Sequence, residues 1–141
     1  MFLPARYVIG TEELISAKNQ GNEASNDYVF GNEDDLVLTG KIVEKNLKMT
    51  KVSMIAQQIG QCPVLSFGNS TGDISMTNLV TGNTLHRTAA FFVCCDDDVR
   101  ENGNAEKAQK MYDLCAENGW VPISMKNDWL TVFGDDVTKK K

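Results

Sequence analysis

A polar turn between two apolar segments holds the residues of this chain that are best suited to chemistry. The run Pro63-Val-Leu-Ser-Phe67 is apolar or small, and Gly68-Asn-Ser-Thr-Gly-Asp73 follows it before an amphipathic segment. A buried strand that ends in such a turn delivers polar side chains to the carboxyl edge of an α/β sheet, where these sheets bind ligands. Asn69 and Asp73 offer oxygen ligands to a hard cation such as Mg²⁺, and the free N–H groups of the following helix favour anions.

The same turn also has a purely structural interpretation. Asn69, Ser70 and Asp73 belong to the residue types that form turns and cap helices, and spacing alone does not separate this role from ligand binding. Asn69-Ser70-Thr71 is also a glycosylation acceptor pattern. The N-terminal residues lack the charged start and apolar stretch of a secretion signal, which disfavours that third interpretation.

Lys51 lies near the start of the helix predicted over residues 50–60. A cation at this end of a helix is slightly unfavourable, because the macrodipole is positive there. The helix should return antiparallel to the strand that follows it, which brings its start close to the carboxyl edge where Asn69 and Asp73 emerge. A lysine in that place could neutralise a bound phosphate or an aspartyl-phosphate.

These motifs together resemble one enzyme family. Lys51-Val-x-x-Ile-x-x-x-Ile-Gly60 and then Pro63-Val-Leu-Ser-Phe-Gly-Asn-Ser-x-Gly-Asp73 resemble the third and fourth motifs of haloacid-dehalogenase-like (HAD) phosphatases. The closest similarity is to the phosphoserine-phosphatase-related branch. Its tail is also similar to later segments of the chain, from Phe91 to Phe133: Phe91-Phe-Val93, Asp97-Asp98-x-Arg100-Glu101, Gly119-Trp120 and Met125-x-x-Asp128-Trp129-x-x-Val-Phe133.

The resemblance implies a role for each residue of the turn. Lys51 would stabilise the transferred phosphate, and Asp73 would hold this lysine or a metal-bound water, as a catalytic and metal-site residue. Asn69 would bind Mg²⁺ through its amide oxygen, while Gly68 and Ser70 would contribute to binding the cofactor and phosphate. Asn69 stands where the family most often has an acid, so we expect weaker metal binding than in those relatives.

The resemblance also implies that part of the enzyme is missing. The family's nucleophile lies in an Asp-x-Asp-x-Thr/Val motif, and no such motif occurs in this sequence. Without it, covalent phosphoryl transfer cannot follow the family's route. We therefore expect the C-terminal part of a Mg²⁺-dependent phosphomonoesterase that acts on a small phosphorylated substrate and is inactive without an N-terminal half. The alternatives are a non-catalytic remnant that binds phosphate or a protein, and an α/β interaction module with a structural turn.

Composition excludes several other classes of protein. The formal charge of −5 and the pI near 4.8 disfavour nucleic acid as a partner. The longest apolar run, residues 89–95, is far shorter than the ~20 residues of a membrane-spanning helix. The four cysteines show no C-x-x-C spacing, which fits reduced thiols in a cytoplasmic protein. The run Asp96-Asp-Asp98 could gather a cation, but a solvated loop is the better interpretation.

The pattern of apolar residues predicts a single α/β domain over residues 1–141. We expect an incomplete Rossmann-like, HAD-type three-layer sandwich with a mostly parallel sheet, in which the strands at 63–67 and 88–95 are neighbours. The continuous apolar run at residues 88–95 is typical of a strand covered on both faces. Unpaired strand edges should make the chain pair with a missing half or with itself, rearrange, or be poorly stable. The expected strands are 6–10, 36–40, 63–67, 88–95 and 120–124, the helices 50–60, 72–80 and 105–115, and the surface loop or loose hairpin 16–35.

Overall fold

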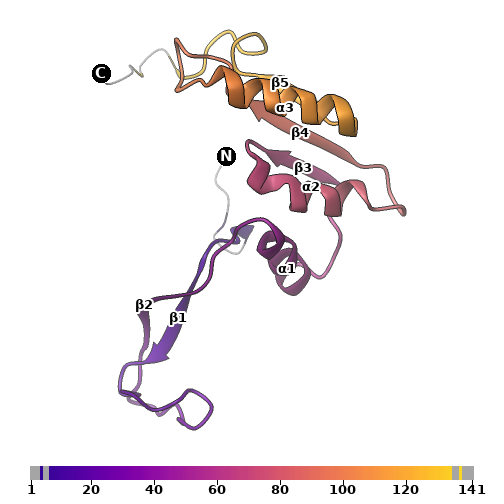
Figure 1. Cartoon of the computed structure of the whole chain (residues 1–141). Helices are drawn as coiled ribbons and strands as arrows, with labels where there is room; N and C mark the ends of the chain where they lie inside the picture. The colour runs from indigo at the N-terminus through magenta and orange to yellow at the C-terminus, as the bar shows by residue number, and fades with distance from the viewer. Residues whose placement is uncertain (1–3, 5–6, 135–136, 138–141) are drawn as a thin grey trace. The chain divides into compact units, whose positions relative to one another are not determined.

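The computed structural model describes residue 4, residues 7–134 and residue 137 (Figure 1). The chain divides into two compact units, Met1–Asn46 and Leu47–Lys141. The single domain expected over residues 1–141 stays a prediction. None of the helices in the described part of the chain is long and apolar enough to cross a membrane.

The first unit is built on a β-hairpin. Strand β1 (Glu12–Ala17) pairs antiparallel with β2 (Leu36–Glu44), and the register is irregular near the start of β1. Residues 18–35 connect the two strands through turns and bends, within the segment expected to be a surface loop or loose hairpin. Lys18 donates its backbone N–H to the Asp35 carbonyl at 2.9 Å, which closes the base of this connection.

The strand expected over residues 6–10 is wrong for the part of it that the structure describes. The Tyr7 backbone N–H donates to the Pro4 carbonyl at 2.9 Å, a group only three residues earlier in the chain. The Ile9 carbonyl accepts a hydrogen bond from the Asn46 side-chain amide at 3.0 Å instead of joining a ladder. The side chain of Asn46, distant in the sequence, therefore provides a hydrogen-bond partner for a backbone carbonyl that the apolar run alone would assign to a sheet.

The second unit contains a three-stranded parallel sheet in the order β3-β4-β5. Its strands are β3 (Leu65–Gly68), β4 (Ala89–Cys94) and β5 (Val121–Ser124). The expected α/β class and the expected pairing of the strands near residues 63–67 and 88–95 are confirmed. Pro122 lies on β5, an edge strand of this sheet, where a missing N–H donor is tolerated.

Three helices accompany the sheet, close to the expected positions. They are α1 (Met49–Gln58), α2 (Ile74–Thr81) and α3 (Ala105–Asn118), and a short 3₁₀ turn at Thr71–Asp73 leads directly into α2. The Asn104 side chain accepts the backbone N–H of Lys107 at the start of α3. Gly119 ends the same helix in the left-handed region at φ 69°, a conformation that glycine adopts without strain.

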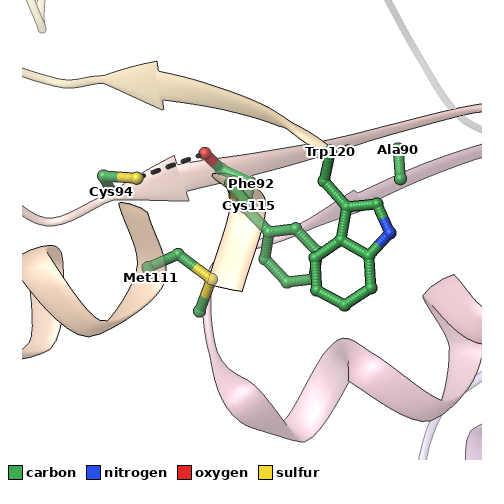
Figure 2. Packing of buried hydrophobic residues seen from close by; sticks show 6 residues of the cluster. All are labelled: Ala90, Phe92, Cys94, Met111, Cys115 and Trp120. Carbon is green, nitrogen blue, oxygen red and sulfur yellow. Dashed lines mark hydrogen bonds between the residues drawn. The ribbon is translucent and has the colours of Figure 1, made fainter. Parts of the chain in front are cut away.

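The core lies between one face of the sheet and helices α2 and α3 (Figure 1). Phe92 is fully buried at its centre and stacks on Trp120 with ring centroids 5.1 Å apart. Cys94 and Cys115 are buried free thiols of the same cluster. Figure 2 shows six members of this cluster: Ala90, Phe92, Cys94, Met111, Cys115 and Trp120.

The opposite face of the sheet is apolar and has no helical layer among the described residues of the second unit. Phe67 stacks on Phe91 with centroids 4.9 Å apart, yet Phe67 remains 62% exposed and Leu65 54% exposed. Helix α1 contacts α2 instead of covering this face. The second helical layer of the expected sandwich does not occur among the described residues of this unit, and on this face the residues of β4 are half-buried.

Candidate functional site

Lys51 and Asp73 form an ion pair at the carboxyl end of β3. Lys51 lies in the first turns of α1, and its Nζ is 2.5 Å from Asp73 Oδ1 at the end of the 3₁₀ turn. The Asp73 side chain is only 8% exposed and that of Lys51 26%. The expected proximity of the helix start and the polar turn is confirmed, while the chemical roles of these residues stay predictions.

The second oxygen of Asp73 organises the turn itself. Asp73 Oδ2 accepts the backbone N–H of Asn69 at 3.0 Å, that of Ser70 at 3.2 Å, and the Ser70 hydroxyl at 3.3 Å. The Ser70 oxygen in turn accepts the Gly72 N–H, which completes a capping box. The structural interpretation of the turn therefore applies to Ser70 and Asp73, whatever further role they have.

These contacts keep the Asp73 carboxylate ionised. Burial is the largest single influence and raises the pKa, but it is outweighed. The hydrogen bond from Lys51, the N–H of Asn69, the positive charge of Lys51 and the N–H of Ser70 together hold the pKa below its ordinary value of 3.8. A buried carboxylate with this many donors is a fixed negative charge that orients the lysine.

Gly68 allows the turn to pack closely. A Cβ at this position would lie 2.7 Å from Cε1 of Phe92 and 2.8 Å from Cβ of Asp73, distances too short for any side chain. The glycine therefore lets the end of β3 approach the core ring and the capping carboxylate together. Its expected contribution to binding a cofactor stays a prediction.

The described residues fit a magnesium ion only in part. Asn69 is exposed, and its side-chain amide makes no hydrogen bond within the described part of the chain, so its oxygen can act as a ligand. Both oxygens of Asp73 are engaged by Lys51 and by the turn. No cluster of three or more acidic, histidine or cysteine side chains suited to a metal occurs in the described regions. Asn69 therefore has a side-chain oxygen available to a ligand, and the expected Mg²⁺ binding stays a prediction.

A cavity of about 330 Å³ opens beside the turn. Asn69, Ser70 and Thr71 line it from the turn, while Lys107 and Lys110 line it from α3. Val93, Cys95 and Met111 complete the lining. Neither lysine was predicted from the sequence, although their spacing of one helical turn, after a strand that ends beside the motif, was an available signal.

In the acidic run after β4, Asp96 and Asp97 are engaged in hydrogen bonds, whereas Asp98 is exposed as expected for a solvated loop. Asp97 is buried, and its Oδ2 lies 2.5 Å from Nε of Arg100. Asp96 accepts the Tyr112 hydroxyl at 2.7 Å and the Ser124 hydroxyl at 2.6 Å. The contacts of Asp96 tie the end of β4 to α3 and β5, so Asp96 and Asp97 have a structural role.

No protein-family model and no curated protein matches this chain.

Proposed function

We propose that this chain is the C-terminal part of a Mg²⁺-dependent HAD-like phosphomonoesterase that acts on a small phosphorylated substrate. The proposal includes the HAD-type core and predicts no turnover without an N-terminal half that supplies the nucleophile. The observation that carries it is the Lys51–Asp73 ion pair, 2.5 Å long, at the carboxyl end of a parallel strand. Neutral residues can also cap a turn of this kind, so a buried carboxylate paired with a lysine is compatible with a role beyond capping.

The geometry suits stabilisation of a phosphate. An ammonium has three N–H donors, and Asp73 accepts one of them in the described structure. The remaining donors can turn toward an anion at the edge of the sheet while Asp73 holds the side chain in place. Preorganised positive charge of this kind stabilises the charge that develops on a transferred phosphoryl group.

Magnesium would be bound jointly with the missing half. Asn69 contributes its amide oxygen, and the partner contributes carboxylates, because Mg²⁺ usually takes one or two carboxylates together with water and substrate oxygens. When bound, the ion would neutralise the negative charge of the substrate phosphate.

The open side of the sheet supports the view that the domain is incomplete. Strand β3 lies at one end of the order β3-β4-β5, so one row of its backbone groups has no strand partner in this sheet. Leu65 and Phe67 of the same strand are more than half exposed. The resemblance to HAD phosphatases places the nucleophile-bearing strand next to this one, and such a strand would pair with the open edge of β3.

A second candidate function is that of a non-catalytic remnant of the same fold, which binds phosphate or a protein. The completed capping box around Ser70 and Asp73 favours it, because it gives these residues a structural task in the absence of a nucleophile. This candidate predicts ligand binding and no turnover in any assembly.

Complementation tests the proposal. We would mix the chain with the N-terminal half of a related phosphatase, which carries Asp-x-Asp-x-Thr, and measure hydrolysis of p-nitrophenyl phosphate with and without Mg²⁺. We expect Mg²⁺-dependent turnover that Lys51→Ala abolishes and Lys126→Gln preserves. A rise in the melting temperature on mixing would show that the halves associate. Association without turnover would favour the non-catalytic remnant, and failure to associate would contradict the proposed incompleteness.

A further inference from the structure

We propose that the cavity between the polar turn and α3 binds a second phosphate group of the ligand, through Lys107 and Lys110. The inference rests on the proposed function for the position of the first phosphate, near Lys51 and Asn69. It makes the preferred ligand a small bisphosphorylated molecule, and it assigns the choice of ligand to α3.

The first argument is the placement of charge. Lys107 and Lys110 are three residues apart on α3, so both point to one side of the helix, and both line the cavity. The chain as a whole is acidic, with a formal charge of −5. Of the ion pairs formed within the described chain, none involves either lysine. Two uncompensated ammonium groups on one cavity therefore attract an anion.

The second argument is the chemistry of the opposite wall. Asn69 has an amide without a hydrogen-bond partner among the described side chains, and Thr71 has an exposed position with a hydroxyl. Both side chains can hydrogen-bond to an anion or to hydroxyl groups of a ligand. Val93 of β4 and Met111 of α3 add apolar surface to the same cavity. A ligand with a short carbon chain and a charged group at each end matches a cavity lined by these polar, apolar and lysine side chains.

The third argument is the choice between kinds of anion. A carboxylate is planar and is best recognised by the fork of an arginine, whereas lysines act as point charges toward the three oxygens of a phosphate. The cavity volume of about 330 Å³ lies at the lower end of the range for small-molecule sites. Two lysines and this volume together favour a second phosphate on a small ligand.

Paired ligands test the inference directly. Isothermal titration of the full chain would compare fructose 1,6-bisphosphate with fructose 6-phosphate, which lacks the second phosphate. We expect the bisphosphate to bind about tenfold more tightly to the unmodified chain, as two charge-assisted contacts allow. The double variant Lys107→Gln/Lys110→Gln should bind both ligands equally, while the control Lys126→Gln should keep the preference. The single variant Lys110→Gln should lose part of it, and circular dichroism would verify that each variant is folded.

The outcomes separate this inference from the proposed function. Equal affinity of the unmodified chain for the two ligands, a preference that survives in the double variant, or no binding of either ligand would each overturn the second phosphate site. Hydrolysis of p-nitrophenyl phosphate by the complemented enzyme does not involve a second phosphate. That activity should therefore persist in the double variant, and its absence from the complemented unmodified protein would count against the proposed function alone.

Discussion

The Lys51–Asp73 and Arg100–Asp97 ion pairs have the same charges and the same separation of 2.5 Å. Each aspartate is buried and follows the carboxyl end of a strand, β3 for Asp73 and β4 for Asp97. The two pairs differ in what the cation does with its other donors. That difference separates a pair that only supports the fold from one that can also bind a ligand.

Arg100 directs all of its donors to the protein. A guanidinium has five N–H groups, and the structure gives them five acceptors. The acceptors are the Asp97 carboxylate and the backbone carbonyls of Met125, Lys126, Trp129 and Leu130. Nothing is left for a ligand, so Arg100 holds the segment after β5 against the end of β4.

Lys51 directs one donor to Asp73 in the described structure, and Asp73 is held by three further donors from the turn. The anion is therefore fixed while the cation keeps bonding capacity. The comparison suggests that the number of donors left over, more than charge or distance, marks a pair as part of a binding site.

The largest effect on stability should come from removing Arg100, the cation whose N–H donors are all bound to the protein. Arg100→Ala breaks five hydrogen bonds and leaves the buried Asp97 without its partner, so we expect the melting temperature to fall by about 10 °C or more. Arg100→Lys should be intermediate, because an ammonium has fewer donors. Arg87→Ala, at an exposed position, serves as the control in the same thermal denaturation series. A shift for Arg100→Ala as small as the control's would remove one side of the comparison.

Two glycines that pack against the aspartates give the next effect. A Cβ at Gly103 would lie 2.5 Å from the backbone carbon of Asp97, whereas one at Gly68 would meet the side chains of Phe92 and Asp73. Backbone yields less than side chains, so Gly103→Ala should destabilise more than Gly68→Ala, for which overpacking predicts about 1–3 kcal/mol. Urea unfolding would measure both, with Gly10→Ala as the control because no atom lies within 4 Å of its added Cβ. The reverse order would show that the segment at Asp97 adapts more easily than the turn.

Removal of Lys51, which gives only one of its N–H donors to Asp73, should reduce stability less than removal of Arg100. Lys51→Ala leaves Asp73 with its three other donors, so we expect a loss of about 1–2 kcal/mol in the free energy of unfolding. The same urea titrations give this value, and Lys126→Gln is the neutral reference. A loss as large as that of Arg100→Ala would indicate that both pairs are purely structural.

The smallest predicted effect concerns how much folding stability is lost as the pH falls below about 4. The hydrogen bond from the backbone N–H of Arg100 is the strongest influence on the pKa of Asp97 and lowers it. For Asp73, burial raises the pKa, but Lys51 and the backbone N–H groups of Asn69 and Ser70 together lower it further. Carboxyls whose pKa is lowered by folding stabilise the fold above their unfolded pKa of about 4, and this stability is lost as the pH falls through the folded pKa. Lys51→Ala removes donors that lower the pKa of Asp73, so the stability lost on acidification should be smaller in this variant, measured by thermal melts between pH 2 and 6 in steps of about half a unit. An unchanged loss of stability on acidification in this variant would show that Lys51 does not govern the ionisation of Asp73.

Local signals in the sequence were enough to predict most elements of the second unit. The helix near 50–60 follows from apolar residues at helical spacing, and it ends at Gln58, two residues before Gly60, which has a φ of 68°. The strand near 88–95 follows from its apolar run. Only one face of this strand is fully buried and the other is half-buried, because α1 packs on α2 and no other described helix of the unit reaches the second face.

Contacts between distant residues explain the other differences. The Ile9 carbonyl binds Asn46, which removes a strand that local pattern favoured. Arg100 binds carbonyls about 25 to 30 residues further on, so the run after Cys95 looked solvated in the sequence. Lys107 and Lys110 were missed because lysines on a helix are usually solvated, and only the fold brings them to the cavity.

A phosphate titration of the ¹⁵N-labelled chain tests most directly whether the Lys51–Asp73 pair, and not the Arg100–Asp97 pair, binds an anion. We expect inorganic phosphate to shift the amide signals of Lys51 and of residues 69–73 in a saturable way, and to leave those of residues 97–100 unchanged. The shifts should be absent in Lys51→Ala and present in Lys126→Gln. Equal shifts at both pairs, no saturable shift at residues 69–73, or full retention in Lys51→Ala would contradict the account.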